Sequence, residues 1–199
     1  MKKRNIQKKF SGKKSGFTLI EMMVALSIFS FSVLAVLVLL GTSISNVGYA
    51  EKKMTASYLA EEGIEFMRNM RDTFVLYDPD GAQKGWEKFN TSLNQCIFTN
   101  NNPNNPDKKC YFDNQGMFST STSIIDIPYT PCNGSCQPMY YEPTNGYGYS
   151  SGTITDYRRD VFAEQITANE TRVFSTVHWQ QKSANFSVTF SEDLFNWVQ

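Results

Sequence analysis

The longest hydrophobic stretch of the chain lies near its start. Residues 22–40 read MMVALSIFSFSVLAVLVLL, nineteen positions without a charged side chain and with three serines as the polar interruptions. An α-helix rises about 1.5 Å per residue, so this stretch covers roughly 30 Å, the thickness of the hydrocarbon layer of a membrane. We expect a transmembrane half-helix that occupies residues 17–41.

From residue 42 the apolar positions become periodic. They recur at spacings of three or four, at Ala56, Ala60, Ile64, Met67, Met70 and Phe74. This spacing predicts an amphipathic helix with one buried face. The charged residues between them predict a solvated opposite face, where Glu61 and Glu65 can meet Arg68 or Arg71. The helix therefore continues over residues 42–76, and the turn sequence Asp78-Pro79-Asp80-Gly81 ends it.

Residues 77–199 predict an extracytoplasmic globular domain. The part over 77–152 is rich in Asn, Pro, Gly, Ser and Thr, which is typical of loops, whereas alternating apolar positions within 153–199 predict β-strands. The predicted strands are 153–166, 171–180 and 185–190. Short polar connections between them indicate an antiparallel meander. We expect this sheet to rest on the amphipathic half of the helix, which gives an α+β fold.

Charge divides the chain into two parts. Of its 19 basic residues, 7 lie in the first sixteen positions, where there is no acidic residue. These are Lys2, Lys3, Arg4, Lys8, Lys9, Lys13 and Lys14. The remainder holds 12 basic and 19 acidic residues, a net charge of −7. The basic start predicts a cytoplasmic N-terminus, and the acidic body argues against direct nucleic-acid binding.

A motif joins the basic start to the apolar stretch. Residues 15–21 read Ser-Gly-Phe-Thr-Leu-Ile-Glu, so that Glu21 places a single carboxylate at the beginning of an apolar helix. A carboxylate deep in a membrane costs up to about 3 kcal/mol, which marks Glu21 as a functional residue that needs a partner, although a contact with the helix dipole would also stabilise it. On hydropathy alone, an uncleaved signal anchor of an unrelated protein is the alternative.

The basic start, Gly16 and the sequence Phe-Thr-Leu-Ile-Glu over 17–21 resemble the N-terminus of type IV prepilins and pseudopilins. The resemblance implies that a prepilin peptidase removes the leader, residues 1–16, by cutting between Gly16 and Phe17, and then methylates the new Phe17 amine. It also implies a charge pair between that amine and Glu21 of an adjacent subunit, which a low-dielectric environment would strengthen. The mature chain would have 183 residues.

The same resemblance implies a structural role. The chain would wait as a single-pass protein of the cytoplasmic (inner) membrane and would then join a pilus or pseudopilus filament. Its partners would be the prepilin peptidase, the inner-membrane assembly platform, other pilin or pseudopilin subunits and membrane lipid, and no cofactor is implied.

Two features favour a minor pilin over a major one. No proline interrupts residues 17–78, and the segment over 56–72 is similar to the second half of the helix in minor pilins and minor pseudopilins. The alternatives are a minor pseudopilin of a type II secretion or DNA-uptake system, and an adhesive binding module at the filament tip.

The four cysteines of the chain are Cys96, Cys110, Cys132 and Cys136. An even number in a segment outside the membrane favours disulfides, and pairing Cys96 with Cys110 and Cys132 with Cys136 would tie down the loops. This is one of three possible pairings. A four-thiolate zinc site is the alternative, for which the spacing of Cys132 and Cys136 is acceptable but that of Cys96 and Cys110 is not. We expect no metal.

Residues that resemble catalytic groups have simpler explanations. His178, the single histidine, would have to centre a Ser-His-Asp triad, but it falls in a predicted strand on the face opposite Val177 and Trp179. Asp78 and Asp80 lack the rest of a calcium loop, and a turn explains them. We therefore expect no enzyme, although a membrane-tethered enzyme is the third hypothesis.

Tyrosines gather in a glycine-containing loop. They are Tyr140, Tyr141, Tyr147 and Tyr149. Aromatic residues are enriched in binding surfaces, so Tyr147 and Tyr149 are candidates for adhesion at a filament tip. The same residues could equally cover the sheet.

Overall fold

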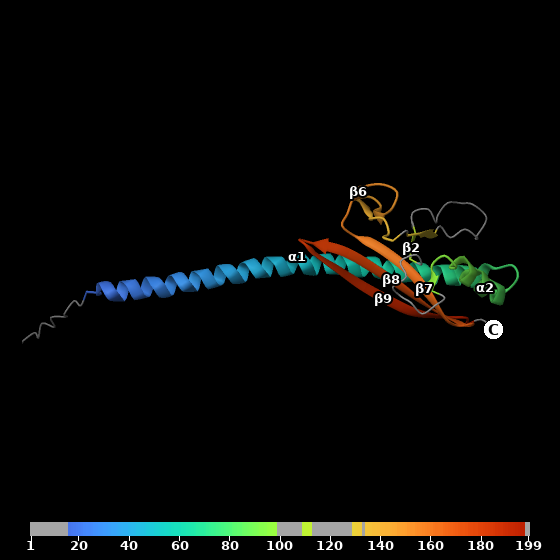
Figure 1. Ribbon diagram of the computed structural model, residues 1–199, viewed down its shortest axis with the longest axis horizontal. Coiled ribbons are helices and arrows are strands. Elements are labelled where there is room, and N and C mark those ends of the chain that lie inside the picture. Colours follow the sequence, from blue (N-terminus) through green and yellow to red (C-terminus); the bar gives the residue numbers. More distant parts are fainter. Residues whose placement is uncertain (1–15, 99–108, 113–128, 133, 198–199) are drawn as a thin grey trace, which may run out of the picture. The chain divides into compact units, whose positions relative to one another are not determined.

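The computed structural model describes residues 16–98, 109–112, 129–132 and 134–197 (Figure 1). The chain divides into two compact units, one ending at Val47 and one beginning at Gly48. One long helix, α1 (Leu19–Tyr77), contributes to both. The described part of the first unit is helical apart from residues 16–18, and the second unit holds a further helix and the strands.

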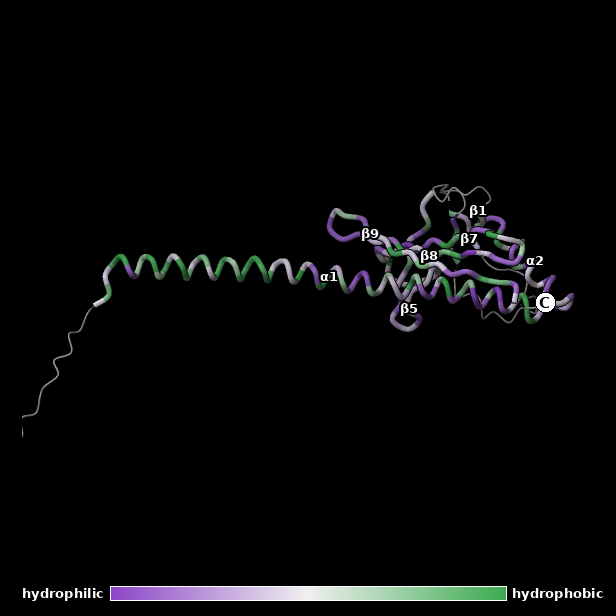
Figure 2. Tube along the Cα trace, turned by 90° about the horizontal axis from the view of Figure 1, so that it is seen from below, coloured by the Kyte–Doolittle hydropathy of each residue, from purple (hydrophilic) through white to green (hydrophobic). Residues whose placement is uncertain are grey.

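The first unit carries the apolar pattern. Almost all of its described side chains are exposed, and Figure 2 shows the hydrophobic colour along this part of α1. The three serines within the apolar stretch donate hydrogen bonds of 2.8 or 2.9 Å to the carbonyl oxygens four residues earlier. They are Ser27, Ser30 and Ser32. Because these bonds satisfy the hydroxyl groups within the helix, the apolar surface tolerates them.

The limits of α1 follow from its flanking residues. The helix begins at Leu19 and ends at Tyr77, close to the limits that the sequence predicts. After Tyr77 the Asp78 carboxylate accepts a hydrogen bond of 2.9 Å from the Asp80 backbone N–H, and Pro79 lies between them. This is the expected turn, since a short aspartate side chain can bond to the backbone two residues further on.

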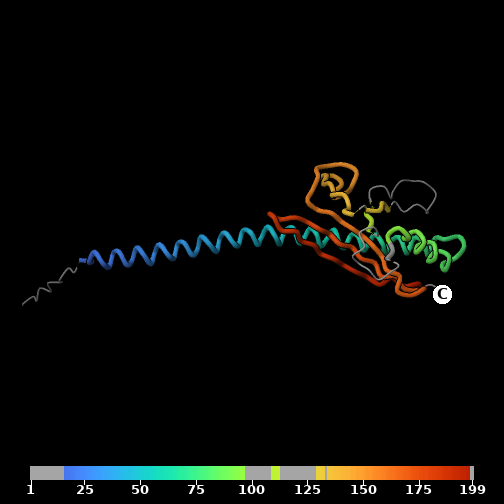
Figure 3. The backbone as a smooth tube through the Cα atoms, in the orientation of Figure 1, coloured from blue at the N-terminus to red at the C-terminus, as the bar shows by residue number. Residues whose placement is uncertain are grey.

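The second unit contains a sheet that runs along α1 from Gly48 onward (Figures 1 and 3). Its strand order is β3-β2-β7-β8-β9, and β1 pairs with β7 in parallel. The long strands are β7 (Arg158–Thr167), β8 (Glu170–Gln181) and β9 (Ala184–Phe195). The short strands are β1 (Ile97–Phe98), β2 (Cys110–Phe112) and β3 (Tyr129–Pro131). The pairing of β7, β8 and β9 is antiparallel, which confirms the predicted meander and the α+β class.

The structure corrects the predicted limits of two strands. Residues 153–166 form no single strand, because β6 (Thr153–Ile154) belongs to a separate sheet of order β5-β4-β6. The other strands of that sheet are β4 (Tyr140–Glu142) and β5 (Gly146–Gly148). Strand β9 continues to Phe195, past the predicted end at residue 190. Alternation alone could not place these limits, since they depend on which strand each residue pairs with.

A second helix, α2 (Ala82–Ser92), lies in the segment that the composition marked as loop. It buries Trp86 and Phe89, which stand three positions apart, and the indole nitrogen of Trp86 donates a hydrogen bond of 2.8 Å to the Ala168 carbonyl. Asn90 of α2 accepts a bond of 2.6 Å from the Thr171 hydroxyl. These contacts with the β7–β8 turn and β8, which are distant in sequence, supply the stability that a helix of this length lacks by itself.

The predicted apolar face of α1 is buried. Ala56, Ala60, Ile64, Met67, Met70 and Phe74 all lie in the core. On β8 the residues that share the core are Val173, Val177 and Trp179, which confirms the predicted face of that strand. Glu65 also pairs with Arg68 as expected, and Arg68 reaches Glu192 of β9 as well.

Gly63 marks the closest approach of α1 to the sheet. A Cβ atom at this position would lie 2.2 Å from the hydroxyl oxygen of Ser175 and 3.3 Å from Cδ of Arg159. Gly85 marks a similar close approach of α2 to α1, since a Cβ atom there would lie 2.1 Å from the Phe74 carbonyl oxygen. The absence of a side chain at these two positions lets the helices pack directly on their neighbours.

Arg159 enters the core beside Gly63. Its side chain is completely buried, and one guanidinium nitrogen donates to the Leu59 carbonyl at 3.1 Å and to the Glu62 carboxylate at 2.7 Å. The guanidinium also lies over the Phe112 ring, 4.4 Å from its centroid. A buried cation needs such compensation, since removing a charge from water is costly.

We predict that Gly63→Ala lowers the free energy of unfolding of the second unit by about 1–3 kcal/mol, because the added methyl group overlaps Ser175. Gly48→Ala is the matched control, since a Cβ atom there would make an ordinary contact of 3.5 Å with Gln181, and alanine favours a helix by about 1 kcal/mol. Near-ultraviolet circular dichroism during urea unfolding of the detergent-solubilised chain measures both. Equal stability of the two variants would contradict the packing argument.

Candidate functional site

The segment before α1 is open. Gly16, Phe17 and Thr18 adopt no regular secondary structure, and a Cβ atom at Gly16 would meet no atom within 4 Å. Phe17 is 85% exposed. The two residues that flank the predicted cleavage point, Gly16 and Phe17, are thus both exposed.

Thr18 and Glu21 close the start of the helix in a reciprocal arrangement. The Glu21 carboxylate accepts hydrogen bonds from the backbone N–H of Thr18 at 2.8 Å and from its hydroxyl group at 2.9 Å, while the Glu21 N–H donates to the Thr18 hydroxyl at 3.3 Å. This is a capping box, which satisfies amide groups that the first turn of a helix leaves unpaired. Our sequence reasoning missed this partner, although the Thr-x-x-Glu spacing was the signal for it.

The helix that follows is long and apolar enough to cross a membrane by its length and composition. Its exposed large side chains run from Leu19 to Val47. Such a surface near the N-terminus is consistent with membrane anchoring of a prepilin-type protein.

The cysteines form two disulfides. Cys96 bonds to Cys110 and Cys132 bonds to Cys136, which is one of the three pairings that the sequence left open. The first bridge joins the start of β1 to β2, and the second closes a loop with a sequence separation of 4. Oxidised cysteines hold no zinc as thiolates. Among the described residues, no group of three or more His, Cys, Asp and Glu side chains is placed to bind a metal.

The paired aspartates serve a turn. The Lys88 ammonium group lies 2.8 Å from the Asp78 carboxylate and 3.0 Å from the Asp80 carboxylate. Lys88 belongs to α2, so the two ion pairs connect the turn to the helix that follows it. The pKa of Asp78 lies below its ordinary value, chiefly because of the hydrogen bond from Lys88.

The tyrosines of the small sheet differ in exposure. Tyr149 is buried, and its hydroxyl donates to the Arg159 carbonyl at 3.4 Å. Tyr147 packs edge-on against Tyr157, with ring centroids 5.8 Å apart, whereas Tyr141 is exposed. A role in adhesion for Tyr147 and Tyr149 stays a prediction, and Tyr141 offers more surface to a partner than either of them.

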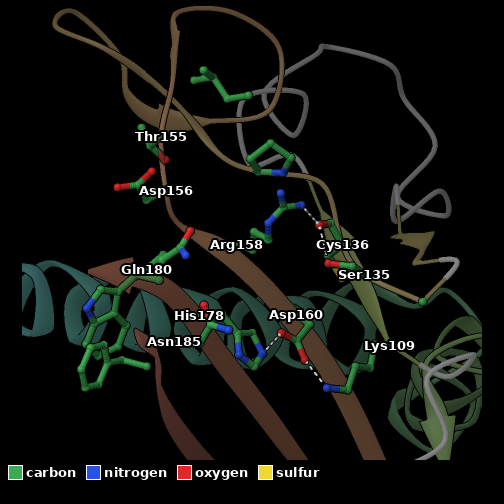
Figure 4. A pocket seen from close by; sticks show the side chains of 15 residues that line it. Lys109, Ser135, Cys136, Thr155, Asp156, Arg158, Asp160, His178, Gln180 and Asn185 are labelled. Carbon is green, nitrogen blue, oxygen red and sulfur yellow. Dashed lines mark hydrogen bonds and ion pairs between the residues drawn. The ribbon is translucent and has the colours of Figure 1, made fainter. Parts of the chain in front are cut away.

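His178 belongs to a cluster of charged groups on the face of the sheet away from α1 (Figure 4). Its Nε2 atom lies 2.7 Å from one carboxylate oxygen of Asp160, and the Lys109 ammonium group lies 2.8 Å from the other. Strand register brings these three side chains together. Arg158 is opposite His178 and Cys110 is opposite Val161, so Asp160 of β7 lies near both His178 and Lys109. Sequence reasoning missed Asp160 and Lys109, since no local pattern connects positions so far apart.

The carboxylate of Asp160 holds this cluster together. Burial raises the pKa of Asp160, but the hydrogen bonds from His178 and Lys109 outweigh that effect, and the net result is a pKa below its ordinary value. The Ser135 hydroxyl, which lies near this cluster (Figure 4), donates a hydrogen bond of 3.5 Å to the Cys136 carbonyl. The cluster therefore resembles a structural ion network more than a Ser-His-Asp triad.

A cleft of about 620 Å³ opens over the cluster. Its floor is the hairpin end of β7, β8 and β9, and one wall is the turn that the Cys132–Cys136 disulfide closes. The segment over 154–156 forms the opposite wall. Figure 4 shows Arg158 between the two walls, with one guanidinium nitrogen donating to the Cys136 carbonyl at 2.9 Å.

We predict that Asp160→Asn lowers the free energy of unfolding at neutral pH by about 2 kcal/mol, because Lys109 and His178 lose a charged partner. A depressed carboxylate pKa stabilises the fold above the ordinary value of about 4, and this stabilisation is lost as the pH falls through the native pKa. The difference between wild type and variant should therefore shrink below about pH 4.

Asp156→Asn is the matched control for that comparison. Asp156 is largely exposed and pairs with Lys52 at 2.9 Å, so its removal should change the unfolding free energy by less than about 1 kcal/mol. Urea titrations between acid and neutral pH measure all three proteins. A difference between wild type and Asp160→Asn that does not depend on pH would contradict the proposed role of the carboxylate.

Comparison with known proteins identifies the N-terminus alone. Residues 11–42 match the family described as the prokaryotic N-terminal methylation motif, and this match includes Gly16, Phe17 and Glu21. No curated protein and no solved structure matches the chain. The motif and the apolar helix together support a type IV pilin-like subunit, a class whose members are structural rather than catalytic.

Proposed function

We propose that this protein is a minor subunit of a type IV pilus or a related filament, assembled from the membrane after its leader is removed. The observation that carries the proposal is the methylation motif at residues 11–42, which leads directly into an exposed apolar helix. A prepilin peptidase cuts between Gly16 and Phe17 and methylates the Phe17 amine. The inner-membrane assembly platform then moves the subunit from lipid into the filament.

The apolar helix supports this exchange of surroundings. Lipid tails cover it before assembly, and the helices of neighbouring subunits cover it afterwards. Because both environments are apolar, the transfer exposes little hydrophobic surface to water and costs little free energy. A filament can therefore take subunits from the membrane without unfolding them.

The minor position rests on two features of the chain. Helix α1 runs from Leu19 to Tyr77 without a proline, the residue that would favour a melted segment of the kind found in many major pilins. The second disulfide ends at Cys136, ahead of strands β4 to β9, whereas major pilins often close a loop near the C-terminus. A minor pseudopilin of a secretion or DNA-uptake filament shares the same N-terminal chemistry.

Glu21 takes two roles in this proposal. Within its own chain it caps the first turn of α1 together with Thr18. In the filament its negative charge faces the cationic amine of Phe17 from an adjacent subunit, where the low dielectric constant strengthens the attraction. The capping bonds keep the carboxylate at the first turn, at the depth in the membrane where the neighbour's new N-terminus lies.

We predict that the chain isolated from cells with an active prepilin peptidase begins at methylated Phe17. Mass spectrometry of the membrane-extracted protein measures this directly. Gly16→Val should leave the leader attached. Because a Cβ atom at Gly16 would meet no atom within 4 Å, the effect would lie in the peptidase reaction and not in the fold. Gly12→Val, a matched change within the leader, should be processed normally. An intact leader on the wild-type chain would refute the proposed processing.

Two variants separate the charge of Glu21 from its capping role. Glu21→Gln keeps an acceptor for Thr18 but removes the charge, so we predict normal processing and at least about tenfold weaker incorporation into filaments. Thr18→Ala keeps the charge and removes the hydroxyl bonds, and it should incorporate nearly normally. Immunoblotting of sheared filaments against membrane fractions measures both. The reverse ranking of the two variants would assign Glu21 to capping alone.

A further inference from the structure

The cleft over Asp160 carries an excess of positive charge. Two permanent cations, Lys109 and Arg158, face a single buried carboxylate, that of Asp160. Asp156 at the rim is paired with Lys52 and adds no net charge. Among the described residues that line the cleft, one positive charge is therefore unbalanced. This is a local reversal, since the body of the chain carries a net charge of −7.

Arg158 is the residue that carries the unbalanced charge. Lys109 is already bound to Asp160, but no carboxylate pairs with Arg158 among the described residues. One guanidinium nitrogen donates to the Cys136 carbonyl. That bond orients the planar group within the cleft, and a guanidinium has further N–H donors to offer a ligand.

The charge of the cleft fits a monoanion. A single unbalanced cation matches one carboxylate, whereas a phosphate or a nucleic-acid backbone would require several basic residues. The acidic body around the cleft would also repel a polyanion. A carboxylate that accepts two parallel bonds from a guanidinium satisfies both partners without a further cation.

The rest of the lining favours a polypeptide over a sugar. Sugars commonly pack on a free aromatic face, but Phe186 packs against both Tyr49 and Trp179, at centroid distances of 5.1 and 5.7 Å. Trp179 itself is buried. The remaining lining offers Pro138 and the exposed Ile154 for apolar side chains, and two amide side chains that can bond to peptide groups. These amides are Gln180 and Asn185.

We propose that the cleft binds a polypeptide segment and receives one Asp or Glu side chain of that segment at Arg158. Asp160 positions Lys109 and His178 beside that carboxylate. The identification of the segment with part of a neighbouring filament subunit rests on the proposed function. The preference of the cleft for a peptide carboxylate does not depend on the proposed function.

His178 makes this proposal directly measurable. It is the single histidine of the chain and lines the cleft, so selective isotope labelling of histidine places one imidazole reporter at the site. The full chain, solubilised in an uncharged detergent, is titrated with the capped peptide acetyl-Ala-Glu-Phe-amide and with acetyl-Ala-Gln-Phe-amide. We expect saturable shifts of the imidazole signals with the Glu peptide, and binding about tenfold weaker with the Gln peptide.

Two variants test the role of Arg158. Arg158→Gln should weaken binding of the Glu peptide about tenfold and abolish the preference over the Gln peptide. Lys53→Gln removes a positive charge from an exposed position of α1 outside the cleft and should bind as wild type does. Circular dichroism verifies that each variant is folded. If Arg158→Gln is not folded, a salt titration of the wild-type chain replaces that variant, and we expect binding of the Glu peptide to weaken as the salt concentration rises.

Several results would overturn the proposal. They are equal binding of the two peptides, an unchanged preference in folded Arg158→Gln, and binding of acetate or trigalacturonate as tightly as the Glu peptide. Absence of imidazole shifts with every probe would overturn it as well. The titration involves neither leader cleavage nor filaments. A negative titration would therefore not contradict the proposed function, and an unprocessed leader would not contradict the peptide preference of the cleft.

Discussion

The rest of this protein depends on one feature, the exposed apolar surface of the N-terminal half of α1. Between Leu19 and Val47 the large hydrophobic side chains of α1 are exposed, and each would lose about 1.5–3 kcal/mol of stabilisation by remaining in water. Lipid tails can remove that cost, and so can the apolar helices of other subunits. This requirement explains why one surface can serve membrane anchoring first and, in the proposed filament, contact between subunits afterwards.

From Gly48 onward a sheet covers the same helix, so the apolar face of this part is buried within the protein. The small residues Ala56, Ala60 and Gly63 let β8 approach closely, and Arg159 fills the space beside them. Its buried charge is compensated by the Glu62 carboxylate and by the Leu59 carbonyl oxygen. The helix thus determines how near the sheet lies, and through the sheet it places the outer face on which the charged cleft forms.

The outer face shows how one buried carboxylate organises its surroundings. Asp160 recruits Lys109 from the end of a short strand and His178 from the neighbouring long strand. With those partners satisfied, Arg158 is left facing the cleft and is oriented by the Cys136 carbonyl. The Cys132–Cys136 disulfide shapes the wall that supplies this carbonyl, so the covalent link has a direct bearing on the candidate binding site.

Local patterns were enough to predict the apolar helix, its amphipathic continuation, the antiparallel meander and the methylation motif. Each of these depends on residues that are close together in the chain, where a period of 3.6 or 2 residues, or a short motif, is visible directly. The Thr18–Glu21 cap was equally local and could have been recognised from its spacing. Helix α2, the separate three-stranded sheet, the burial of Arg159 and the meeting of Lys109, Asp160 and His178 could not be read in this way. They depend on strand register and on contacts between distant segments, and such contacts become favourable only once the chain has folded and buried its apolar faces.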